Sequence, residues 1–502
     1  MRKTLRTTTY IIVTLLAGAG LLLMAGCATH RPYMDSAVLR EKILPPLTPA
    51  APLPTTPAAS LREKGAVLPS GPLTLQDAIA IALTNNHTLK ISNEDAGIAE
   101  QQVYVARSLF LPQVTAGYGY DIRDREVVQG FGPQTIPIAE KEFQRAELKV
   151  QMTIWDFGRS LGNYQQAQLG REIADLTMQR VRQNIIYQVT QAYFNVLRAQ
   201  KARDIAAEAL EQARAHLKTA TSLYENGVVD KNDVLRAEVH VAEVRQQLIS
   251  AENALKLSIS VLNNVLGINV NSPTMVKGVT EAPEFQMDLV SALRTAIDHR
   301  PEFKLVQKSI RMEKAGLKAA RAEHFPRIYV AGTLSRLDDD YQVHKNSALG
   351  EVGIQIDLFS GGRTTAQIRV AERRIQKAAE TARQVCDGIA LEVKQALLGI
   401  EEARKRLAVA KKAVSQAEEN LRLVENKYRQ TAATPTDVVD AETLKTRAQM
   451  NYFTALYDYI VAVERLRYAM GTNEGQRQLG PINKVEDGNI GDAGSSKEVK
   501  RQ

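Results

Sequence analysis

The sequence carries one long pattern twice, and this duplication constrains the fold more than any other feature. Residues 73–271 reappear, weakly but in the same order, as residues 287–471. The clearest matching segments are Phe110-Leu-Pro112 with Phe325-Pro326, and Asp156-Phe-Gly-Arg159 with Phe359-Ser-Gly-Gly-Arg363. Each copy is far longer than the repeat of a solenoid protein. The duplication therefore predicts two similar halves and a symmetric, oligomeric assembly.

The first residues are typical of a bacterial secretion signal. Three basic residues precede the apolar run Tyr10–Met24, which is short for a membrane span. The run ends in Leu23-Met-Ala-Gly-Cys27, and small residues before a cysteine resemble a lipoprotein cleavage site. We expect residues 1–26 to be removed as a signal peptide and Cys27 to be acylated, for example with palmitate. An ordinary signal peptide with an incidental cysteine is the alternative. No aspartate follows Cys27, which favours the outer membrane.

Residues 27–72 form an acylated N-terminus followed by a proline-rich linker, whose composition favours extended chain over a packed core. Residues 272–286 are a connector between the two copies, and residues 472–502 are a polar C-terminal tail. Once Cys27 is acylated, Cys386 has no intrachain disulfide partner, and its helical context predicts a small buried apolar side chain. The net charge of +8 comes from interspersed acidic and basic residues, so nucleic acid is not an expected partner.

Two stretches without proline are predicted to be single, unusually long helices. They cover residues 159–225 and 363–428, and at 1.5 Å per residue each would be roughly 100 Å long. After a short break each long helix is followed by a second helix, over residues 231–267 in the first copy and 435–470 in the second. Each copy therefore ends in a helical hairpin, and one further helix precedes its strands.

Apolar residues in the second long helix step by four and three without a break, a heptad pattern that predicts coiled-coil packing. These seam residues are Ile389, Val393, Ala396, Ile400, Ala403, Leu407, Ala410, Val414, Ala417, Leu421, Val424 and Tyr428. The same phase holds 204 residues earlier in the first long helix, with Arg203 as its one exception. Over most of the seam, large residues alternate with alanine, so we expect the helices to approach closely. The pattern gives no role for Arg203.

Between the first helix and the long helix of each copy the apolar period changes to two, which predicts β-strands. The expected strands cover residues 113–123 and 146–156 in the first copy, and 327–336 and 350–359 in the second. One face of these strands is apolar and the other is charged or small, as in a strand between lipid and a wet lumen. A half-buried hairpin of a soluble protein has the same pattern and stays open as an alternative.

Aromatic residues stand at every junction between strand and helix, which favours the membrane interpretation. They are Phe110, Trp155 with Phe157, Phe325 and Phe359. In a membrane they would form a belt at one interface, whereas in a soluble fold they would cap a sheet. Strands in lipid must close into a barrel, and the smallest such barrels have about eight strands. One chain supplies four strands, so a membrane barrel requires a dimer or a trimer.

The duplication, the two strand-to-helix turns and the two helix-break motifs together resemble the TolC/OprM family of outer-membrane channel-tunnel proteins over about residues 73–471. The resemblance implies a membrane α+β fold in which a homotrimer shares a 12-stranded transmembrane β-barrel, with four strands per chain, on a long α-helical coiled-coil tunnel. It implies an outer-membrane channel component of a tripartite efflux or type I secretion system that gives passive export. The implied partners are a periplasmic adaptor (membrane fusion) protein, an inner-membrane pump or ABC exporter, and outer-membrane lipid.

The resemblance also implies a lipid-anchored protein in the outer membrane of a Gram-negative bacterium, with a gate at its periplasmic end. Asp437 and Asp440 match paired acidic residues that line the closed aperture, where rings of carboxylates favour cations. Two solvated or helix-capping aspartates are the alternative. Asp233 and Tyr428 match two partners of a tip latch, but Ala433 stands where the family has arginine. The latch is therefore incomplete in this chain.

The hairpin tips are implied to dock the adaptor. The residues concerned are Gly227, Val228, Thr431 and Ala432, although a turn that only reverses the helix would look the same. No enzyme activity, metal or cofactor is expected, because the histidines are scattered and no phosphate-binding or nucleophile motif is present.

Two other functions compete with export. A non-conducting structural coiled-coil lipoprotein that bridges the cell envelope would explain the heptads and Cys27, but not the alternating strands. A periplasmic adaptor would normally carry one hairpin within a lipoyl-like domain, and the two-copy layout argues against it. The sequence does not identify the exported cargo, which in the family includes drugs, metals and proteins, nor the adaptor and pump.

Overall fold

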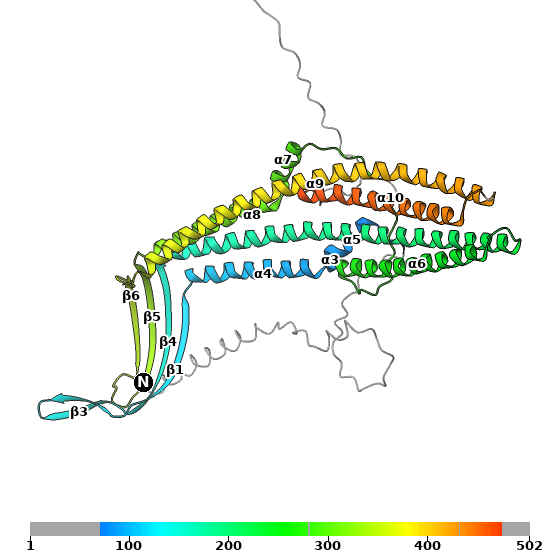
Figure 1. The fold of residues 1–502 in the computed structure, drawn as a ribbon. Coiled ribbons are helices and arrows are strands. Elements are labelled where there is room, and N and C mark those ends of the chain that lie inside the picture. Colours follow the sequence, from blue (N-terminus) through cyan, green and yellow to red (C-terminus); the bar gives the residue numbers. More distant parts are fainter. Residues whose placement is uncertain (1–70, 280–281, 431, 474–502) are drawn as a thin grey trace, which may run out of the picture. The chain divides into compact units, whose positions relative to one another are not determined.

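The computed structural model describes residues 71–279, 282–430 and 432–473 (Figure 1). The expected signal peptide, Cys27, Thr431, the linker up to residue 70 and the tail from residue 474 lie outside the described residues.

The same order of elements occurs in both copies. In the first, two helices lead into two long strands and two helices follow: α3 (Leu75–Asn85), α4 (His87–Arg107), β1 (Gln113–Ile122), β4 (Glu142–Trp155), α5 (Arg159–Glu225) and α6 (Lys231–Leu266). The second copy contains α7 (Leu289–His299), α8 (Pro301–Ala322), β5 (Arg327–Asp338), β6 (Asn346–Gln355), α9 (Arg363–Arg429) and α10 (Pro435–Ala469). A short 3₁₀ turn, η1 (Ser108–Phe110), joins α4 to β1.

The two long helices, α5 and α9, each contain 67 residues and fold back as hairpins with α6 and α10 (Figure 1). The seam residues expected in α9 are all buried or half-buried in the isolated chain, as the heptad pattern predicts. In α5 the exceptional residue Arg203 is half-buried and pairs with its neighbour Asp204 at 3.1 Å. The seam therefore accommodates a guanidinium by turning it toward a carboxylate on the same helix.

The long strands form one antiparallel sheet in the order β1-β4-β5-β6. β4 and β5 belong to different copies, so the sheet joins the two halves of the chain at its centre. The register places Leu148 of β4 opposite Leu334 of β5, and Val330 of β5 opposite Val352 of β6. Apolar residues thus align across neighbouring strands on one face.

Strand bounds differ from those expected from the alternation of residues. β4 begins at Glu142 and not at residue 146, and β6 covers Asn346–Gln355 and not 350–359. Pairing with β5 sets the end of β6, because Arg327, the first residue of β5, lies opposite Gln355. The apolar alternation runs on past Gln355, so the residue pattern placed this strand too late.

A second sheet of two strands, not expected from the sequence, connects β1 to β4. β2 (Val127–Phe131) and β3 (Gln134–Ala139) pair around Gly132, whose φ of +65° suits glycine. Pro137 stands within β3, where it cannot donate to the ladder. Its presence, together with a register shift after Val127, is why the alternation is too weak to reveal the hairpin.

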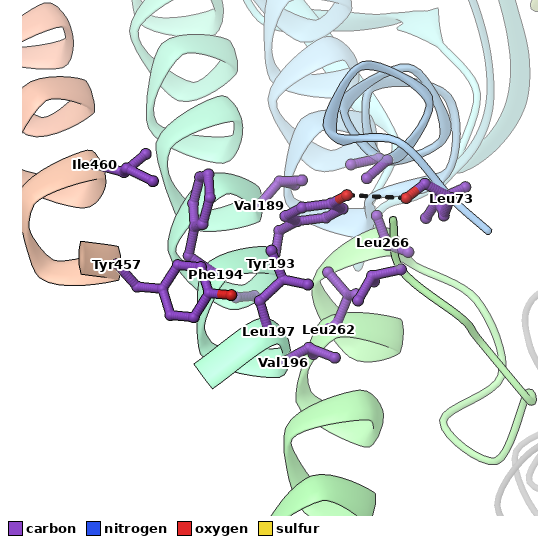
Figure 2. Close-up of a cluster of buried hydrophobic side chains, with 14 of the residues drawn as sticks. Leu73, Val189, Tyr193, Phe194, Val196, Leu197, Leu262, Leu266, Tyr457 and Ile460 are labelled. Atoms are coloured by element: carbon purple, nitrogen blue, oxygen red, sulfur yellow. Dashed lines mark hydrogen bonds between the residues drawn. The ribbon is translucent and has the colours of Figure 1, made fainter. Parts of the chain in front are cut away.

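A cluster of buried side chains joins α3, α5, α6 and α10 (Figure 2). Tyr193 and Phe194 of α5 lie at its centre, with Tyr457 of α10 beside them. The Tyr193 hydroxyl donates to the carbonyl of Lys277 at 2.7 Å and lies 3.0 Å from that of Leu73. Burial raises the pKa of Tyr193 to about 12, so the hydroxyl keeps its proton at neutral pH and holds these two segments. A second cluster joins α7 and α9 to α10.

One helix was expected before the strands of each copy, but the structure has two, separated by a break at Asn86 and at Arg300. Asn86 begins the new helix, since its side-chain carbonyl accepts from the backbone of Thr88 at 2.9 Å. At the equivalent break Arg300 is buried, and Pro301 occupies the first helical turn. Hydrogen bonds to Glu302 and Glu392 raise the pKa of Arg300 despite its burial, so it stays charged.

The last helix of each copy ends in a glycine that packs against the break of the same copy. Gly267 after α6 has a φ of +72°, and a Cβ there would lie 2.6 Å from the carbonyl oxygen of Asn85. Gly471 after α10 has a φ of +74°, and its Cβ would lie 3.0 Å from the backbone nitrogen of Arg300. Both copies thus need glycine for conformation and for space.

Cys386 corrects one expectation. It is exposed in the isolated chain, not buried, because the seam continues from Ile389 to Val385, which packs against the core, and Cys386 is the next residue round the helix.

Gly267→Ala is expected to lower the free energy of unfolding by at least about 2 kcal/mol, because alanine disfavours the left-handed backbone and its Cβ would overlap Asn85. Gly399→Ala is the matched control, since this α9 glycine has open space around the added Cβ and lies inside a helix. Thermal unfolding followed by far-UV circular dichroism measures both. Equal midpoints for the two variants would contradict the packing at Gly267.

Candidate functional site

The four-stranded sheet has one apolar face that the isolated chain leaves exposed. Val352 and Ile354 of β6 are 78% and 71% exposed, and Val114 of β1 and Leu334 of β5 are also exposed. The opposite face carries mainly polar residues, including the aligned row Glu147, Ser335 and Ser347. An apolar face formed by alternate residues of four strands requires an apolar environment or a partner.

Aromatic side chains gather where strands meet helices. Phe157 stacks on Phe325 with ring centroids 5.2 Å apart, and Trp155 contacts Phe157 edge-on at 6.1 Å. Phe110 packs against Tyr164 of α5 at 6.0 Å, whereas Phe359 is exposed. The structure therefore brings the junctions of the two copies together through Phe157 and Phe325. This arrangement is common at a membrane–water interface and also at the end of a buried sheet.

The turn before α5 is built by the motif Asp156-Phe-Gly-Arg159. The carboxylate of Asp156 accepts from the backbone of Ser160 at 2.7 Å, and Gly158 has a φ of +97°. Phe157 is the one non-glycine residue with a positive φ among the described residues, at 54°. This backbone conformation directs Phe157 toward Phe325 and explains why the motif contains an aspartate and a glycine.

The tips of the two hairpins use different turn chemistry. In the first, Gly227 has a φ of +73° and the backbone nitrogen of Val228 donates to the carbonyl of Leu223 at 2.9 Å, a glycine-ended helix. Asp230 precedes α6 but makes no side-chain cap. In the second, Thr434 and Asp437 form a capping box and Pro435 follows the cap. Ala432 and Val228 are both exposed, and Thr431 lies outside the described residues.

The two candidate aperture aspartates differ in their surroundings. One carboxylate oxygen of Asp437 accepts from both the backbone nitrogen and the hydroxyl of Thr434 at 2.8 Å. These hydrogen bonds lower the pKa of Asp437 below its ordinary value. Asp440, one turn further along α10, is exposed. Asp437 therefore caps the start of α10. Asp440 takes no part in this capping box.

The candidate latch residues lie near each other without a hydrogen bond between them. Tyr428 is 4% exposed, and its hydroxyl has no hydrogen-bond partner among the described residues. Burial and the negative charge of Asp233 raise the pKa of Tyr428. The ring of Tyr428 instead lies 5.2 Å from that of His216 on α5.

Sequence reasoning missed three side chains near the candidate latch, one of which, His216, contacts Tyr428. His216 is buried on α5, and the side chain of His240 on α6 lies 3.2 Å from that of Glu442 on α10. No short sequence motif indicates this cluster, because its members lie on four helices and are brought together only by packing. No group of three or more histidine, cysteine or acidic side chains in the described chain has metal-binding geometry.

None of the helices formed by the described residues combines the length and apolar character that a membrane-spanning helix needs.

Residues 78–268 and 292–472 match the sequence profile of the outer membrane efflux protein family, one match in each copy. The outer membrane efflux protein BepC of Brucella suis is 22% identical over 402 residues, which is 79% of this chain and 85% of BepC. The outer membrane protein TolC of Escherichia coli is 24% identical over 409 residues, covering 78% of this chain and 80% of TolC.

Among solved structures, the CmeC outer membrane channel of Campylobacter jejuni superposes with a TM-score of 0.71 at 16% identity. The match covers 85% of this chain and 95% of CmeC, so the two share a fold. The profile match spans both copies and most of the chain, and it confirms the resemblance found in the sequence. The chain therefore belongs to the outer membrane efflux protein family.

Proposed function

We propose that this protein is the outer-membrane channel component of a tripartite efflux or type I secretion system, and that it gives passive export across the periplasm and the outer membrane. The observation that carries the proposal is the open four-stranded sheet with an exposed apolar face, joined directly to two long helical hairpins. Apolar strands suit lipid, and the helices provide a body long enough to reach far from the sheet.

Closure of the sheet requires other copies of the chain. β1 and β6 stand at the ends of the sheet, and hydrocarbon cannot satisfy their outer backbone groups. Four strands are too few for a lipid barrel, whose smallest form has about eight. A dimer would reach that number, and the family resemblance favours the homotrimer, with a shared 12-stranded barrel, over it.

The internal duplication supports a specific contact between chains. Inside one chain α5 packs closely on α8, where a Cβ on Gly162 would lie 2.9 Å from the Cβ of Ala319. The equivalent helices of the other copies are α9 and α4. A stripe of residues seven apart on α4 is exposed in the isolated chain: Ile91, Ile98 and Val105. We infer that α9 of a neighbouring chain covers this stripe, as α5 packs on α8 within a chain.

Charge supports the same contact. An ion pair joins Lys308 of α8 to Glu172 of α5. The duplication offsets of 214 and 204 residues place Glu94 and Gln376 at the equivalent positions on α4 and α9. Gln376 accepts from Arg373, and Lys377 follows it on α9. The intrachain pair has a base on α8 and an acid on α5, whereas the proposed contact would bring the acid Glu94 of α4 toward a stretch of α9 that carries Lys377, and opposite charges there would attract.

The remaining parts of the proposal follow the family. Cys27 would carry the lipid anchor, and the linker would extend from it to α3. The tips Gly227 with Val228, and Thr431 with Ala432, would meet a periplasmic adaptor protein, which connects to an inner-membrane pump or ABC exporter. Asp440 would line the aperture at those tips together with Asp437. The cargo is not specified by the residues described here.

Asp440→Ala is expected to reduce the cation selectivity of the reconstituted channel and to enlarge its openings, because each chain then removes one carboxylate from the aperture. Asp437→Ala should do the same and also loosen the start of α10, since Asp437 completes the capping box. Single-channel conductance and reversal potentials in a salt gradient measure both effects.

Unchanged selectivity in both variants would place the aperture at other residues. No conductance from confirmed oligomers of the wild type would favour the alternative, a structural coiled-coil lipoprotein that bridges the envelope.

Ile98→Arg is expected to prevent assembly, because a buried guanidinium without a partner would replace an apolar contact between α4 and its neighbour. Light scattering of the purified protein should then give the mass of a single chain. Val128→Arg, the same kind of change in the β2–β3 hairpin, is the control and should leave the oligomer intact. An Ile98→Arg variant with wild-type mass would show that α4 is not the interface.

Cys27→Ser is expected to abolish the fatty-acyl mass on the mature N-terminus and to release the protein from dependence on lipoprotein processing. Mass spectrometry of the N-terminal peptide measures this. A wild-type protein that begins at another residue and carries no acyl chain would contradict the lipid anchor.

A further inference from the structure

Four side chains, one from each helix of the two hairpins, form two neighbouring contacts near the hairpin tips: His216 of α5 with Tyr428 of α9, and His240 of α6 with Glu442 of α10. We propose that this cluster, the hairpin joint, is a pH-sensitive contact that holds the two hairpins together at neutral pH and releases them on acidification. Its use in opening a channel rests on the proposed function, whereas the joint itself does not.

The joint consists of two contacts that both cross from one hairpin to the other. The ring of His216 lies 5.2 Å from the ring of Tyr428, with the planes inclined at 53°. The Nε2 atom of His240 lies 3.2 Å from a carboxylate oxygen of Glu442. Every helix of the two hairpins thus contributes one side chain, and separation of the hairpins would break both contacts together.

The joint is shielded from water. His216, Tyr428 and Glu442 are 7%, 4% and 6% exposed. The Nε2 atom of His216 and the hydroxyl of Tyr428 are both buried without a hydrogen-bond partner among the described residues. A buried polar atom that lacks a partner weakens the packed state, and it becomes much more unfavourable when it acquires a charge.

The two histidines have different surroundings. The side chain of Glu442 lies against His240. A protonated His216 has no hydrogen-bonded counterion, because the Glu442 carboxylate lies against His240 and Tyr428 offers only an aromatic ring and an unbonded hydroxyl. The charge of Glu442 attracts a charge on His216, and a charge on His240 repels it. Protonation of His216 is therefore the event that disfavours the packed hairpins.

The sign of the effect follows from the direction of the pKa shift. Burial lowers the pKa of His216 below 6.5, the charge of Glu442 opposes this shift, and the charge of His240 adds to it. Separation of the hairpins returns His216 to water and to its ordinary pKa, so the separated state binds the proton first. The packed state is favoured above about pH 6.5 and loses stability as the pH falls below it.

Two further polar contacts join the hairpins close to the joint. Arg236 of α6 donates to the hydroxyl of Thr436 on α10 at 2.9 Å, and Lys445 of α10 pairs with Glu208 of α5 at 2.9 Å. Asp233 of α6 lies near Tyr428, and its negative charge raises the pKa of that tyrosine. Histidine is the side-chain type of the joint whose ordinary pKa lies between about pH 5 and pH 8.

The test measures the distance between the hairpins directly. Spin labels are attached at Glu225→Cys and Arg429→Cys, the last residues of α5 and α9, in a full-length chain that also carries Cys386→Ser. Labelled chains are diluted into unlabelled chains, so that pairs within one chain dominate. Between about pH 7.5 and pH 5 we expect the population with the longer distance to rise several-fold.

His216→Phe keeps an aromatic ring beside Tyr428 without a titratable group, and this population should then stay constant with pH. His216→Gln is the second variant, should the first not fold. His87→Phe removes an exposed histidine on α4 and should respond like the wild type.

Two results would contradict the proposed pH response of the hairpin joint. One is a wild-type distance distribution that does not change with pH. The other is a His216→Phe or His216→Gln variant that responds as the wild type does. The distance measurement does not require conduction. A chain that shows the pH-dependent distance but never conducts would therefore contradict the proposed function and leave the joint in place.

Discussion

The backbone groups along the outer sides of β1 and β6 impose the requirement on which the rest of the structure depends. A sheet of four strands with one apolar face is stable in lipid only when these edges are paired. A single chain lacks the strands for closure, so the proposed membrane barrel requires further copies of the chain. The exposed stripe on α4 is best understood as part of the same requirement, because a helical body that carries a shared sheet must also share its helical contacts.

The two copies share a packing arrangement more closely than they share the residues that form it. Gly267 and Gly471 occupy the same place in the two copies, each pressed against the break between the first two helices. The residue at that break has nevertheless changed from Asn86, which caps a helix, to Arg300, which is held by two carboxylates. The backbone geometry at the break therefore accepts either of two unlike polar residues, provided that the residue packed against the break is glycine.

Much of the fold could be predicted because its signals are periodic and long. The heptads predicted both α5 and α9, and an arginine at one seam position did not interrupt the helix, because arginine is a good helix former. Its guanidinium pairs with Asp204. Strand bounds were less accurate, since alternation reports which face a residue occupies but not where pairing ends. The β2–β3 hairpin escaped detection because Pro137 and a register shift break its alternation.

The candidate site was predictable only where it depends on local sequence. Thr434 and Asp437 are three residues apart, and their capping box was one of the two interpretations of the aspartate. The hairpin joint depends on residues 216, 240, 428 and 442, and no local pattern links them. Three-dimensional proximity between helices is the information that a single sequence lacks.

The unlike tips of the two hairpins have a consequence for stoichiometry. One tip ends in a glycine turn at Gly227, and the other begins with the capping box of Thr434. A partner that recognises the chemistry of one turn would bind once per chain. A partner that recognises only the paired helix ends would bind twice per chain, on sites that are similar but not identical. The number of partner molecules bound per chain thus depends on whether the partner distinguishes the two short loops at the tips.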